Sequence, residues 1–445
     1  MEFGSERLAA ALAAIDESWP GARFCVALSG GLDSTVLLHA MTALCRREGT
    51  GGLRAVHLDH GLQAESAAWA EVCRAACRAA GVPLEVISLR LVPADGASIE
   101  AAARDARYAA LARNLQPGEW LLTAHHRDDQ LETVLIQLLR GAGVAGLAAM
   151  PARASFGRGW HARPLLDVDR ACLAAYAKRH ALAWIEDPMN DAERYDRGWL
   201  RANVLPAIRD RWPAAAATVA RSAAHLAQAS RLLAEVAAAD AAGVLEDGRL
   251  AVEGLRRLSH DRQVNLVRWW LRCQGLRPPP AGRRAASMRV FFDARRDAAP
   301  CLRWEGGALR RYRGRLYALP PMSSEPLLAP ASGSSSCYDL GPGLGQFALI
   351  AGDGGGLCAA RAGAATIRFR SGGESLRPHP DRPRKRLKDL CQENGIVPWM
   401  RDRLPLVYVG ERLAAVGDLW IDVEFAVPAG RPALKPVWTD RPRLY

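Results

Sequence analysis

One six-residue segment near the N-terminus, Ser29-Gly30-Gly31-Leu32-Asp33-Ser34, has the composition of a phosphate-binding loop. Two adjacent glycines let the chain turn tightly and bring backbone N–H groups against an anion, and the start of a following helix adds a partial positive charge. The serines can donate hydrogen bonds to phosphate oxygens, and Asp33 can hold Mg²⁺ or orient the phosphates. An ordinary strand-to-helix turn has a similar composition, so the segment alone leaves both interpretations open.

The segment differs from the two best-known nucleotide-binding motifs. A Walker A loop requires a lysine, whereas the first 177 residues contain none. The dinucleotide fingerprint G-x-G-x-x-G separates its glycines, whereas these two are adjacent. Phosphate binding here would therefore depend on backbone amides, serine and arginine.

Short apolar runs alternate with helical patterns from about residue 7 to 210, which is typical of βαβ units around a parallel sheet. We predict strands at 23–28, 53–58, 84–89 and 120–124, with helices at about 34–45, 64–80 and 98–114. The predicted fold is a doubly wound, mostly parallel α/β sheet. Ligands of such sheets bind at the carboxyl ends of the strands, where the segment 29–34 lies.

By composition, the chain divides into three domains and a linker. Residues 7–211 form the expected catalytic domain, and residues 212–318 an all-α middle domain, because Ala- and Leu-rich patterns without strand-like alternation begin there. The Pro/Ser/Gly-rich stretch 319–345 reads as a linker. Residues 346–445 are expected to form a small α+β C-terminal domain, with strands near 365–370, 406–409 and 413–416 and a basic helix near 384–393.

Charge and cysteine usage limit the function classes. The formal net charge is +12, which favours a polyanionic partner, and all basic residues are arginine except four lysines at 178, 385, 388 and 435. The ten cysteines include no C-x-x-C pair, which leaves zinc ribbons and iron–sulfur ligation without support. No secretory segment and no uncharged apolar stretch of 18 residues is present, so we expect a cytoplasmic protein without a membrane span.

The S-G-G-x-D-S segment resembles the pyrophosphate loop of the N-type ATP pyrophosphatases, the PP-loop superfamily, and further segments from about residue 20 to 425 resemble bacterial tRNA(Ile)-lysidine synthases. The resemblance implies an enzyme that uses ATP and Mg²⁺ to adenylate the C2 oxygen of the wobble cytidine of tRNA(Ile) with a CAU anticodon. Free L-lysine then replaces that oxygen, and pyrophosphate and AMP leave. Asp33 is the implied magnesium ligand.

Three N-terminal segments carry the resemblance beyond the loop. His57 and His60 lie in an H-x-x-H-G-L segment, and for both histidines a packing role in a loop and a functional role are equally well supported. Arg104 and Arg107, in an E-x-x-A-R-x-x-R-Y helix, share a helix face and can reach one anion, although an exposed pair is the alternative. The segment 123–133 resembles an A-H-H-x-D-D-Q-x-E-T pattern. The resemblance implies that Asp129 and Glu132 bind and deprotonate the lysine substrate. It also implies that His125 contacts phosphate or nucleotide. Of Asp128 and Asp129, one is expected only to complement the helix dipole.

The remaining segments are weaker. Residues 139–147 and 163–166 resemble R-G-x-G-x-x-G-L and R-P-L-L. Residues 187–201 resemble D-x-S-N-x-D-x-x-Y-x-R-N-x-x-R, except that Met189 and Gly198 stand where Ser and Asn are usual. The resemblance implies that Arg197 and Arg201 contact the substrate. Together with Arg104 and Arg107, they are candidates for offsetting the negative charge that develops during the reaction. The C-terminal segment resembles a tRNA-binding domain whose implied contacts are Arg370, Lys385, Arg386, Lys388, Trp399, Arg401 and Arg403.

Three other functions remain open at this stage. A tRNA 2-thiolation enzyme of the same superfamily is the main alternative, and the absence of C-x-x-C argues against it. A small-molecule amidotransferase or synthetase is a second alternative, weakened because this sequence has no N-terminal cysteine nucleophile. A non-catalytic RNA-binding protein is the third, and it would not need the acidic residues of the loop regions. The sequence leaves the oligomeric state, including a homodimer, undecided.

Overall fold

The computed structural model describes residues 2–50, 52–59, 66–89, 99–186, 195–279, 291, 300–321, 329–330, 337–341, 343–358, 360, 365–428, 430–442 and 444. The chain divides into two compact units, residues 1–233 and 234–445. Each unit is described by itself.

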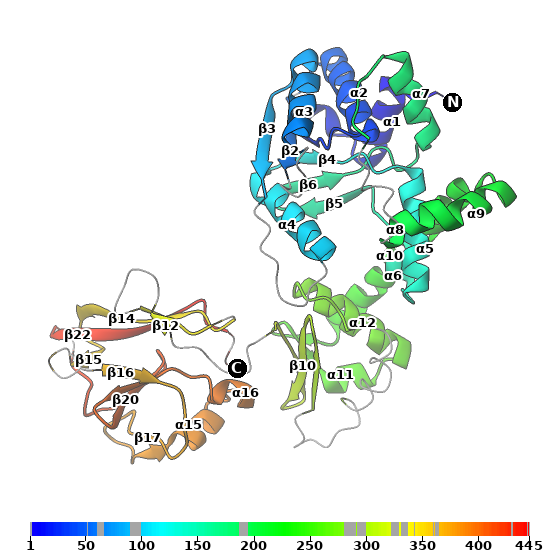
Figure 1. The fold of residues 1–445 in the computed structure, drawn as a ribbon. Helices are drawn as coiled ribbons and strands as arrows, with labels where there is room; N and C mark the ends of the chain where they lie inside the picture. The colour runs from blue at the N-terminus through cyan, green and yellow to red at the C-terminus, as the bar shows by residue number, and fades with distance from the viewer. Residues whose placement is uncertain are drawn as a thin grey trace. The chain divides into compact units, whose positions relative to one another are not determined.

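The first unit contains the predicted α/β domain (Figure 1). Its elements, in chain order, are α1 (Ser5–Ile15), η1 (Trp19–Gly21), β1 (Phe24–Ala27), α2 (Leu32–Glu48), β2 (Leu53–Asp59), α3 (Ser66–Ala80), β3 (Leu84–Ser88), α4 (Ile99–Asn114), β4 (Trp120–Leu122), α5 (Arg127–Leu139), α6 (Val144–Leu147), β5 (Arg153–Phe156), β6 (Gly159–Ala162), α7 (Arg170–Arg179), α8 (Asp196–Trp199), the π-helical turn η3 (Leu200–Val204) and α9 (Leu205–Arg211). The helix α10 (Ala215–Ala242) crosses the boundary between the units.

The sheet of the first unit has the strand order β3-β2-β1-β4-β6-β5. All neighbouring strands pair in parallel except β5 and β6, which pair antiparallel. The chain runs outward from β1 to β3 on one side and continues through β4 on the other, so the order reverses between β1 and β4. Loops at the carboxyl ends of two such strands diverge and leave a crevice for ligands. The loop 28–31 and the segment 123–126 follow these two strands, so both lie at the carboxyl edge of the sheet where the sequence predicts the site.

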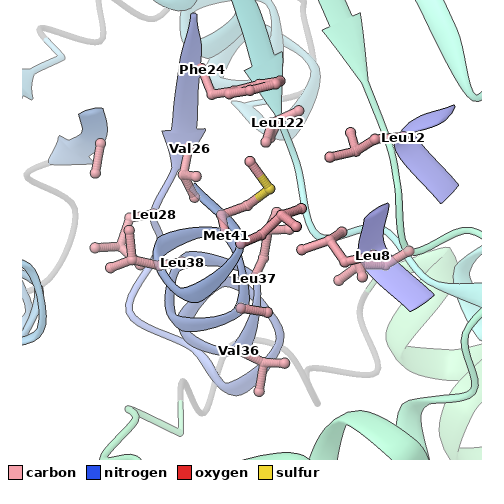
Figure 2. Packing of buried hydrophobic residues seen from close by; sticks show 14 of the residues in the cluster. Leu8, Leu12, Phe24, Val26, Leu28, Val36, Leu37, Leu38, Met41 and Leu122 are labelled. Carbon is pink, nitrogen blue, oxygen red and sulfur yellow. The ribbon is translucent and has the colours of Figure 1, made fainter. Parts of the chain in front are cut away.

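Helices cover both faces of this sheet, as a doubly wound fold requires (Figure 1). Phe24 and Val26 of β1 point to the face covered by α1, α2, α3 and α7, where Leu12 and Met41 belong to the same buried cluster (Figure 2). Cys25, between them in sequence, points to the opposite face and packs in the cluster that contains Leu111 of α4. This period of two is the pattern of a strand buried on both sides. Each fully buried large apolar side chain contributes about 1.5–3 kcal/mol to this core.

The second unit is richer in strands than the sequence indicates. Its elements are β7 (Leu245–Glu246), β8 (Arg249–Ala251), α11 (Val252–Arg256), α12 (His260–Cys273), β9 (Cys301–Trp304), β10 (Gly307–Tyr312), β11 (Arg315–Leu319), β12 (Ala329–Pro330), β13 (Cys337–Asp339), β14 (Gln346–Asp353), β15 (Leu357–Cys358), β16 (Ala365–Arg368), β17 (Ser375–Leu376), β18 (Lys385–Arg386), α15 (Leu387–Glu393), α16 (Pro398–Arg401), β19 (Leu406–Val409), β20 (Arg412–Val416), β21 (Trp420–Ile421) and β22 (Pro432–Thr439). The strands form antiparallel sheets in the orders β7-β8-β11-β10-β9, β12-β13-β14-β22-β15, β16-β19-β20-β21 and β17-β18.

Two predictions for the chain after residue 211 need correction. The helices predicted for the middle segment are confirmed by α10, α11 and α12, but the segment is not all-α, because it also contributes a five-stranded sheet. In β10 the inward positions are Gly307, Leu309 and Arg311; an arginine on the buried face hides the alternation that identifies a strand. The stretch 319–345 is more than a linker, because β12 and β13 pair with one another and extend the sheet of β14. Within the described residues, none of the helices is long and apolar enough to cross a membrane.

Candidate active site

The loop between β1 and α2 is held in shape by its own serines. Ser29 Oγ and Ser34 Oγ share a hydrogen bond of 3.0 Å, and Ser34 Oγ also lies 3.0 Å from the carbonyl oxygen of Gly31, to which it can donate. Gly31 is the N-cap of α2, and the first N–H groups of a helix have no partner inside the helix. The loop therefore directs backbone donors and the positive end of the helix dipole toward one place, which is the arrangement that binds phosphates.

Gly30 is the position of this loop at which a side chain would be both strained and crowded. Its φ is +86°, and its carbonyl oxygen accepts a hydrogen bond of 2.9 Å from Ile185 N–H. A Cβ atom at Gly30 would lie 2.9 Å from Ile185 Cδ1 and 3.1 Å from Cys73 Sγ. Gly31 has a φ of −74°, and a Cβ atom there would meet Ser29 Oγ at 3.6 Å, an ordinary contact.

These two glycines provide a matched pair of variants. We expect Gly30→Ala to lower the free energy of unfolding by about 1–3 kcal/mol, because it forces a Cβ into a left-handed, crowded position, and to weaken ATP binding. Gly31→Ala should leave the stability nearly unchanged. Urea unfolding and ATP titration measure the two effects, and equal losses in the two variants would contradict the assignment.

Asp33 is a partly buried carboxylate with one buried, unpaired oxygen. It lies in the first turn of α2; its Oδ2 is 3.7 Å from His126 Nε2 and 3.9 Å from Arg170 Nε, whereas Oδ1 is buried and has no hydrogen-bond partner. Burial raises the pKa of Asp33 above its ordinary value, although His126 and Arg170 oppose the shift. A buried, unsatisfied carboxylate oxygen costs stability unless a ligand uses it, and one or two carboxylates together with phosphates are the ligands that Mg²⁺ prefers. The donor set at Asp33 therefore fits the predicted metal.

The two aspartates at the start of α5 have different surroundings. Asp129 Oδ2 accepts a hydrogen bond of 2.9 Å from the backbone N–H of His126, the N-cap residue, in a capping box. Burial alone would raise the pKa of Asp129, but His126 and the backbone hydrogen bond shift the pKa below its ordinary value. Asp128 instead accepts hydrogen bonds from Arg209, at 2.7 Å, and from the backbone N–H of Arg170. Asp129 thus has a capping role in addition to the predicted role in lysine binding.

Arg201 lies between the two carboxylates that were predicted to hold a cation. Its Nε donates to Glu132 Oε1 at 2.6 Å, and its Nη2 donates to Glu132 Oε2 at 3.0 Å and to Asp129 Oδ1 at 3.3 Å. The side chain of Glu132 is only 2% exposed. Burial raises the pKa of Glu132, and the hydrogen bonds and charge of Arg201 reduce the shift. Asp129 and Glu132 therefore face one cation, the guanidinium of Arg201, and their binding of a lysine substrate stays a prediction.

His125 and the arginines of α4 contact different groups. His125 Nδ1 is 2.8 Å from Thr123 Oγ1, which is also 2.8 Å from His161 Nε2. The guanidinium carbons of Arg104 and Arg107 lie 5.1 and 5.5 Å from the centre of the Tyr108 ring, respectively. Arg104 is exposed and Arg107 is partly buried, so both remain candidates for binding an anion.

Of the other predicted N-terminal residues, some have contacts within the protein and the rest lie outside the described residues. His57 is buried, and its Nδ1 lies 2.8 Å from the carbonyl oxygen of Leu28; because a carbonyl only accepts, this nitrogen donates, which favours a packing role. Arg197 Nη2 donates to Thr133 Oγ1 at 3.1 Å, and Gly198 is buried in α8. The positions of His60, Asp187, Met189 and Asn190 lie outside the described residues.

In the C-terminal unit, one predicted tRNA contact is wrong. Trp399 is 6% exposed and belongs to the core cluster of that unit, where its ring packs against Tyr312 and Tyr317. Apolar burial therefore explains its place, and its ring is not available at the surface. The motif could not distinguish a stacking platform from a core residue, because both use a large aromatic side chain.

The predicted basic contacts are engaged to different degrees. Arg370 pairs with Glu374 and Asp402, and Lys385 pairs with Glu393 at 2.8 Å. Arg401 donates to the carbonyl oxygen of Ile396, and Arg403 donates to that of Trp399. Arg386 and Lys388 are exposed. Of the predicted set, these last two are the residues most accessible to an anionic partner.

Sequence reasoning missed three residues of the site region. Arg170 and Arg209 contact Asp33 and Asp128, respectively, and His161 lies behind His125. Arg170 follows the R-P-L-L segment closely, and this was a signal that arginine could approach the loop. No spacing rule connects Arg209 with a helix that begins 82 residues earlier.

Comparison with known proteins accounts for nearly the whole chain. The family models that match describe a PP-loop domain over residues 5–208, a TilS substrate binding domain over residues 250–317 and a TilS substrate C-terminal domain over residues 365–438. The tRNA(Ile)-lysidine synthase of Methylococcus capsulatus is 43% identical over 94% of this chain and 97% of its own. Those of Alkalilimnicola ehrlichii, 44% identical over 96% of both chains, and Pseudomonas aeruginosa, 44% identical over 89% of both chains, are similarly close. Such identity over whole chains, together with a PP-loop at the switch point of the sheet, shows that the chain belongs to the tRNA(Ile)-lysidine synthase family.

Proposed function

We propose that this protein ligates free L-lysine to C2 of the wobble cytidine of tRNA(Ile) with a CAU anticodon, in the cytoplasm and at the expense of ATP. The observation that carries the proposal is the position of two acidic groups at one crevice. Asp33, on the phosphate-binding loop, lies 3.7 Å from His126, and His126 caps the helix that carries Asp129 and Glu132. A nucleotide site and a cation site therefore adjoin one another.

The loop 29–34 supports binding of ATP through its backbone donors and its two serines. Asp33 would hold Mg²⁺, which offsets negative charge on the phosphates when bound. The unpartnered Oδ1 of Asp33 supports this assignment. Arg170, 3.9 Å from Asp33 Oδ2, adds positive charge near the loop, where the chain has no lysine.

The acidic cluster supports binding of the amine. Asp129 and Glu132 carry two carboxylates, and Arg201 supplies one guanidinium between them, so the pair retains an attraction for a second cation. The raised pKa of Glu132, caused by burial, makes this carboxylate the better proton acceptor of the two. Only the neutral amine is nucleophilic, and in this proposal Glu132 takes the proton of the lysine ε-ammonium.

The reaction follows in two displacements. The C2 oxygen of the cytidine attacks the α-phosphorus of ATP, and the bond to the β-phosphate breaks to release pyrophosphate. The lysine nitrogen then attacks C2, the bond from C2 to the adenylated oxygen breaks, and AMP leaves while the nitrogen loses its proton to the acidic cluster. The cytidine must be extruded from the anticodon stack for two reactants to approach it. The exposed Arg386 and Lys388 of the C-terminal unit are suited to contact tRNA phosphates.

One assay tests the proposal as a whole. The full chain is incubated with [α-³²P]ATP, tRNA(Ile) bearing a CAU anticodon and radiolabelled lysine. We expect AMP release that depends on lysine, and label from lysine in the tRNA. AMP release at the same rate with and without lysine, or no radiolabelled lysine in the tRNA, would contradict the proposal.

The buried cysteines of the first unit argue against the thiolation alternative. All ten cysteines are free thiols. Burial raises the pKa of both Cys25 and Cys73 to about 12 and that of Cys77 to about 11. A thiol in this state forms almost no thiolate near neutral pH, and the thiolate is the reactive form.

We therefore expect Cys73→Ala to retain lysine incorporation, even though Cys73 is the thiol packed against the loop at Gly30. The expected change is a small loss of stability from the cavity that a smaller side chain leaves. The radiolabel assay measures incorporation, and thermal unfolding measures stability. Abolished incorporation in a variant that still folds would favour a sulfur-transfer role.

A further inference from the structure

A line of hydrogen bonds joins the carboxyl ends of the neighbouring strands β4 and β6, beside the crevice. It starts at Arg163, whose Nη2 is 3.1 Å from His161 Nδ1, and passes from His161 Nε2 to Thr123 Oγ1 and from Thr123 Oγ1 to His125 Nδ1, both at 2.8 Å. Thr123 and His125 follow β4, and His161 lies on β6, its neighbour in the sheet. The proposed reaction gives Arg163, Thr123 and His161 no role.

The chemistry of these groups fixes the direction of every bond in the line. Arginine only donates, so His161 Nδ1 accepts and a neutral His161 carries its hydrogen on Nε2. That hydrogen goes to Thr123 Oγ1, and the hydroxyl hydrogen of Thr123 is then available for His125. Among the described residues Thr123 Oγ1 has no third partner, so His125 Nδ1 accepts this hydrogen. His125 must then carry its own hydrogen on Nε2.

The surroundings keep both rings neutral. Burial lowers the pKa of His125 to about 3, against the opposing charge of Asp129, and Arg163, Arg197 and Arg107 lower it further. Burial likewise lowers the pKa of His161 to about 3, assisted by Arg163, His125, Arg107 and Arg104. A neutral ring with a fixed tautomer offers one donor and one acceptor, and here the acceptor is already used.

His125 is the histidine of the line that a ligand can reach. Its side chain is partly exposed, whereas Thr123 and His161 are buried. It follows β4 at the point where the strand order reverses, next to the phosphate-binding loop after β1. Within the part of the chain that the structure describes, its Nε2 has no hydrogen-bond partner.

We propose that Arg163, acting through His161 and Thr123, holds His125 as the neutral Nε2–H tautomer, so that His125 donates a hydrogen bond to a phosphate oxygen of the bound nucleotide. Arg163, His161 and Thr123 are positioning residues in this scheme, and His125 is the group that touches the ligand. The identity of the ligand as ATP rests on the proposed function, whereas the tautomer does not. The R-P-L-L segment thereby gains a role through its arginine.

The first test is independent of catalysis. Long-range ¹H–¹⁵N correlation spectra of the histidine-labelled full chain distinguish ring nitrogens that carry hydrogen from those that do not, and His125→Asn and His161→Asn assign the signals. We expect Nε2–H for both rings in the wild type. Thr123→Val should leave His125 in a mixture of tautomers, whereas Thr123→Ser should restore the wild-type spectrum. A wild-type His125 with its hydrogen on Nδ1, or an unchanged tautomer in Thr123→Val, overturns the proposal.

The second test connects the tautomer to the nucleotide. Titration of the wild type with ATP and Mg²⁺ should shift the Nε2–H signal of His125. Thr123→Val and Arg163→Met should reduce the rate of pyrophosphate release by about 10- to 100-fold, as loss of an outer residue that orients a ligand group commonly does, without changing the KM for lysine. Arg153→Met, which removes an arginine of the neighbouring strand β5 that pairs with Asp16 instead, is the matched control.

The outcomes separate the two proposals. If the wild type shows the Nε2–H tautomer and an ATP-induced shift but never transfers lysine to tRNA, the proposed function fails and the role of the line stands. If Thr123→Val changes the tautomer and leaves pyrophosphate release unchanged, the line has no role in nucleotide binding and this inference fails.

Discussion

Asp33→Asn is expected to reduce the release of pyrophosphate at least about 100-fold, a loss typical of removing a charged group that stabilises a transferring phosphate. Asn keeps the shape of the side chain but not its charge, so the variant cannot hold Mg²⁺ against the phosphates. Release of labelled pyrophosphate from ATP in the presence of tRNA measures the effect. Wild-type activity in this variant would remove Asp33 from the site.

The same variant should not be less stable than the wild type, which separates a functional loss from a folding defect. Burial raises the pKa of Asp33 above its ordinary value of 3.8, so the native state binds this proton more tightly than the unfolded chain does. The contribution of Asp33 to the free energy of unfolding is therefore lost as the pH rises through its raised pKa. Asn has no such dependence, and we expect an equal or higher Tm near neutral pH.

A matched control for Asp33 exists on the other side of His126. Asp128 Oδ2 lies 3.7 Å from His126 Nδ1, the same distance that separates Asp33 Oδ2 from His126 Nε2. Asp128 is occupied by Arg209 and Arg170, whereas Asp33 has a buried oxygen without a partner. Asp128→Asn should therefore retain most of the pyrophosphate release.

Glu132→Gln should separate the two displacements of the reaction. We expect pyrophosphate release to persist and lysine incorporation to fall at least about 100-fold, because a general base contributes about 10²–10⁴ to the rate and glutamine cannot accept the proton of the amine. Gln keeps an oxygen for Arg201 Nε, so the segment that carries Arg201 should stay in place. The measurement compares labelled pyrophosphate release with incorporation of labelled lysine in the same reaction.

Equal loss of both displacements in Glu132→Gln would contradict this division of roles. Asp129 is the less suitable residue for the test. Asp129→Ala removes the acceptor of the His126 N–H, and loss of such a cap costs about 0.5–2 kcal/mol. Asp129→Asn keeps the cap and is the proper companion variant.

The sequence predicted the first unit well because its strands are apolar runs between turn residues. The predicted strands at 23–28, 53–58, 84–89 and 120–124 correspond to β1, β2, β3 and β4. The hairpin of β5 and β6 was missed, since Gly159, Trp160 and His161 do not read as an apolar run. The strands of the middle segment were missed for a related reason: β7 and β8 are two and three residues long, too short to show alternation.

The site was predictable where its residues are close in sequence. Asp129 and Glu132 are three apart on a helix, and their shared side follows from helical geometry. Arg201 is 69 residues beyond Glu132, and only the folded chain brings the two together. Trp399 shows a second limit of prediction from sequence, because a motif match does not indicate whether a side chain points into the core or toward solvent.

The hydrogen-bond line through His161 makes the pairing of β4 with β6 part of the chemistry. Leu121 pairs with His161 and Leu122 with Ala162, and a slip of one residue would turn His161 to the opposite face of the sheet. A single insertion or deletion within β6 would therefore disconnect Arg163 from His125 without touching any residue that meets the nucleotide. We expect the length of β6 to be under tighter selection than most of its side chains.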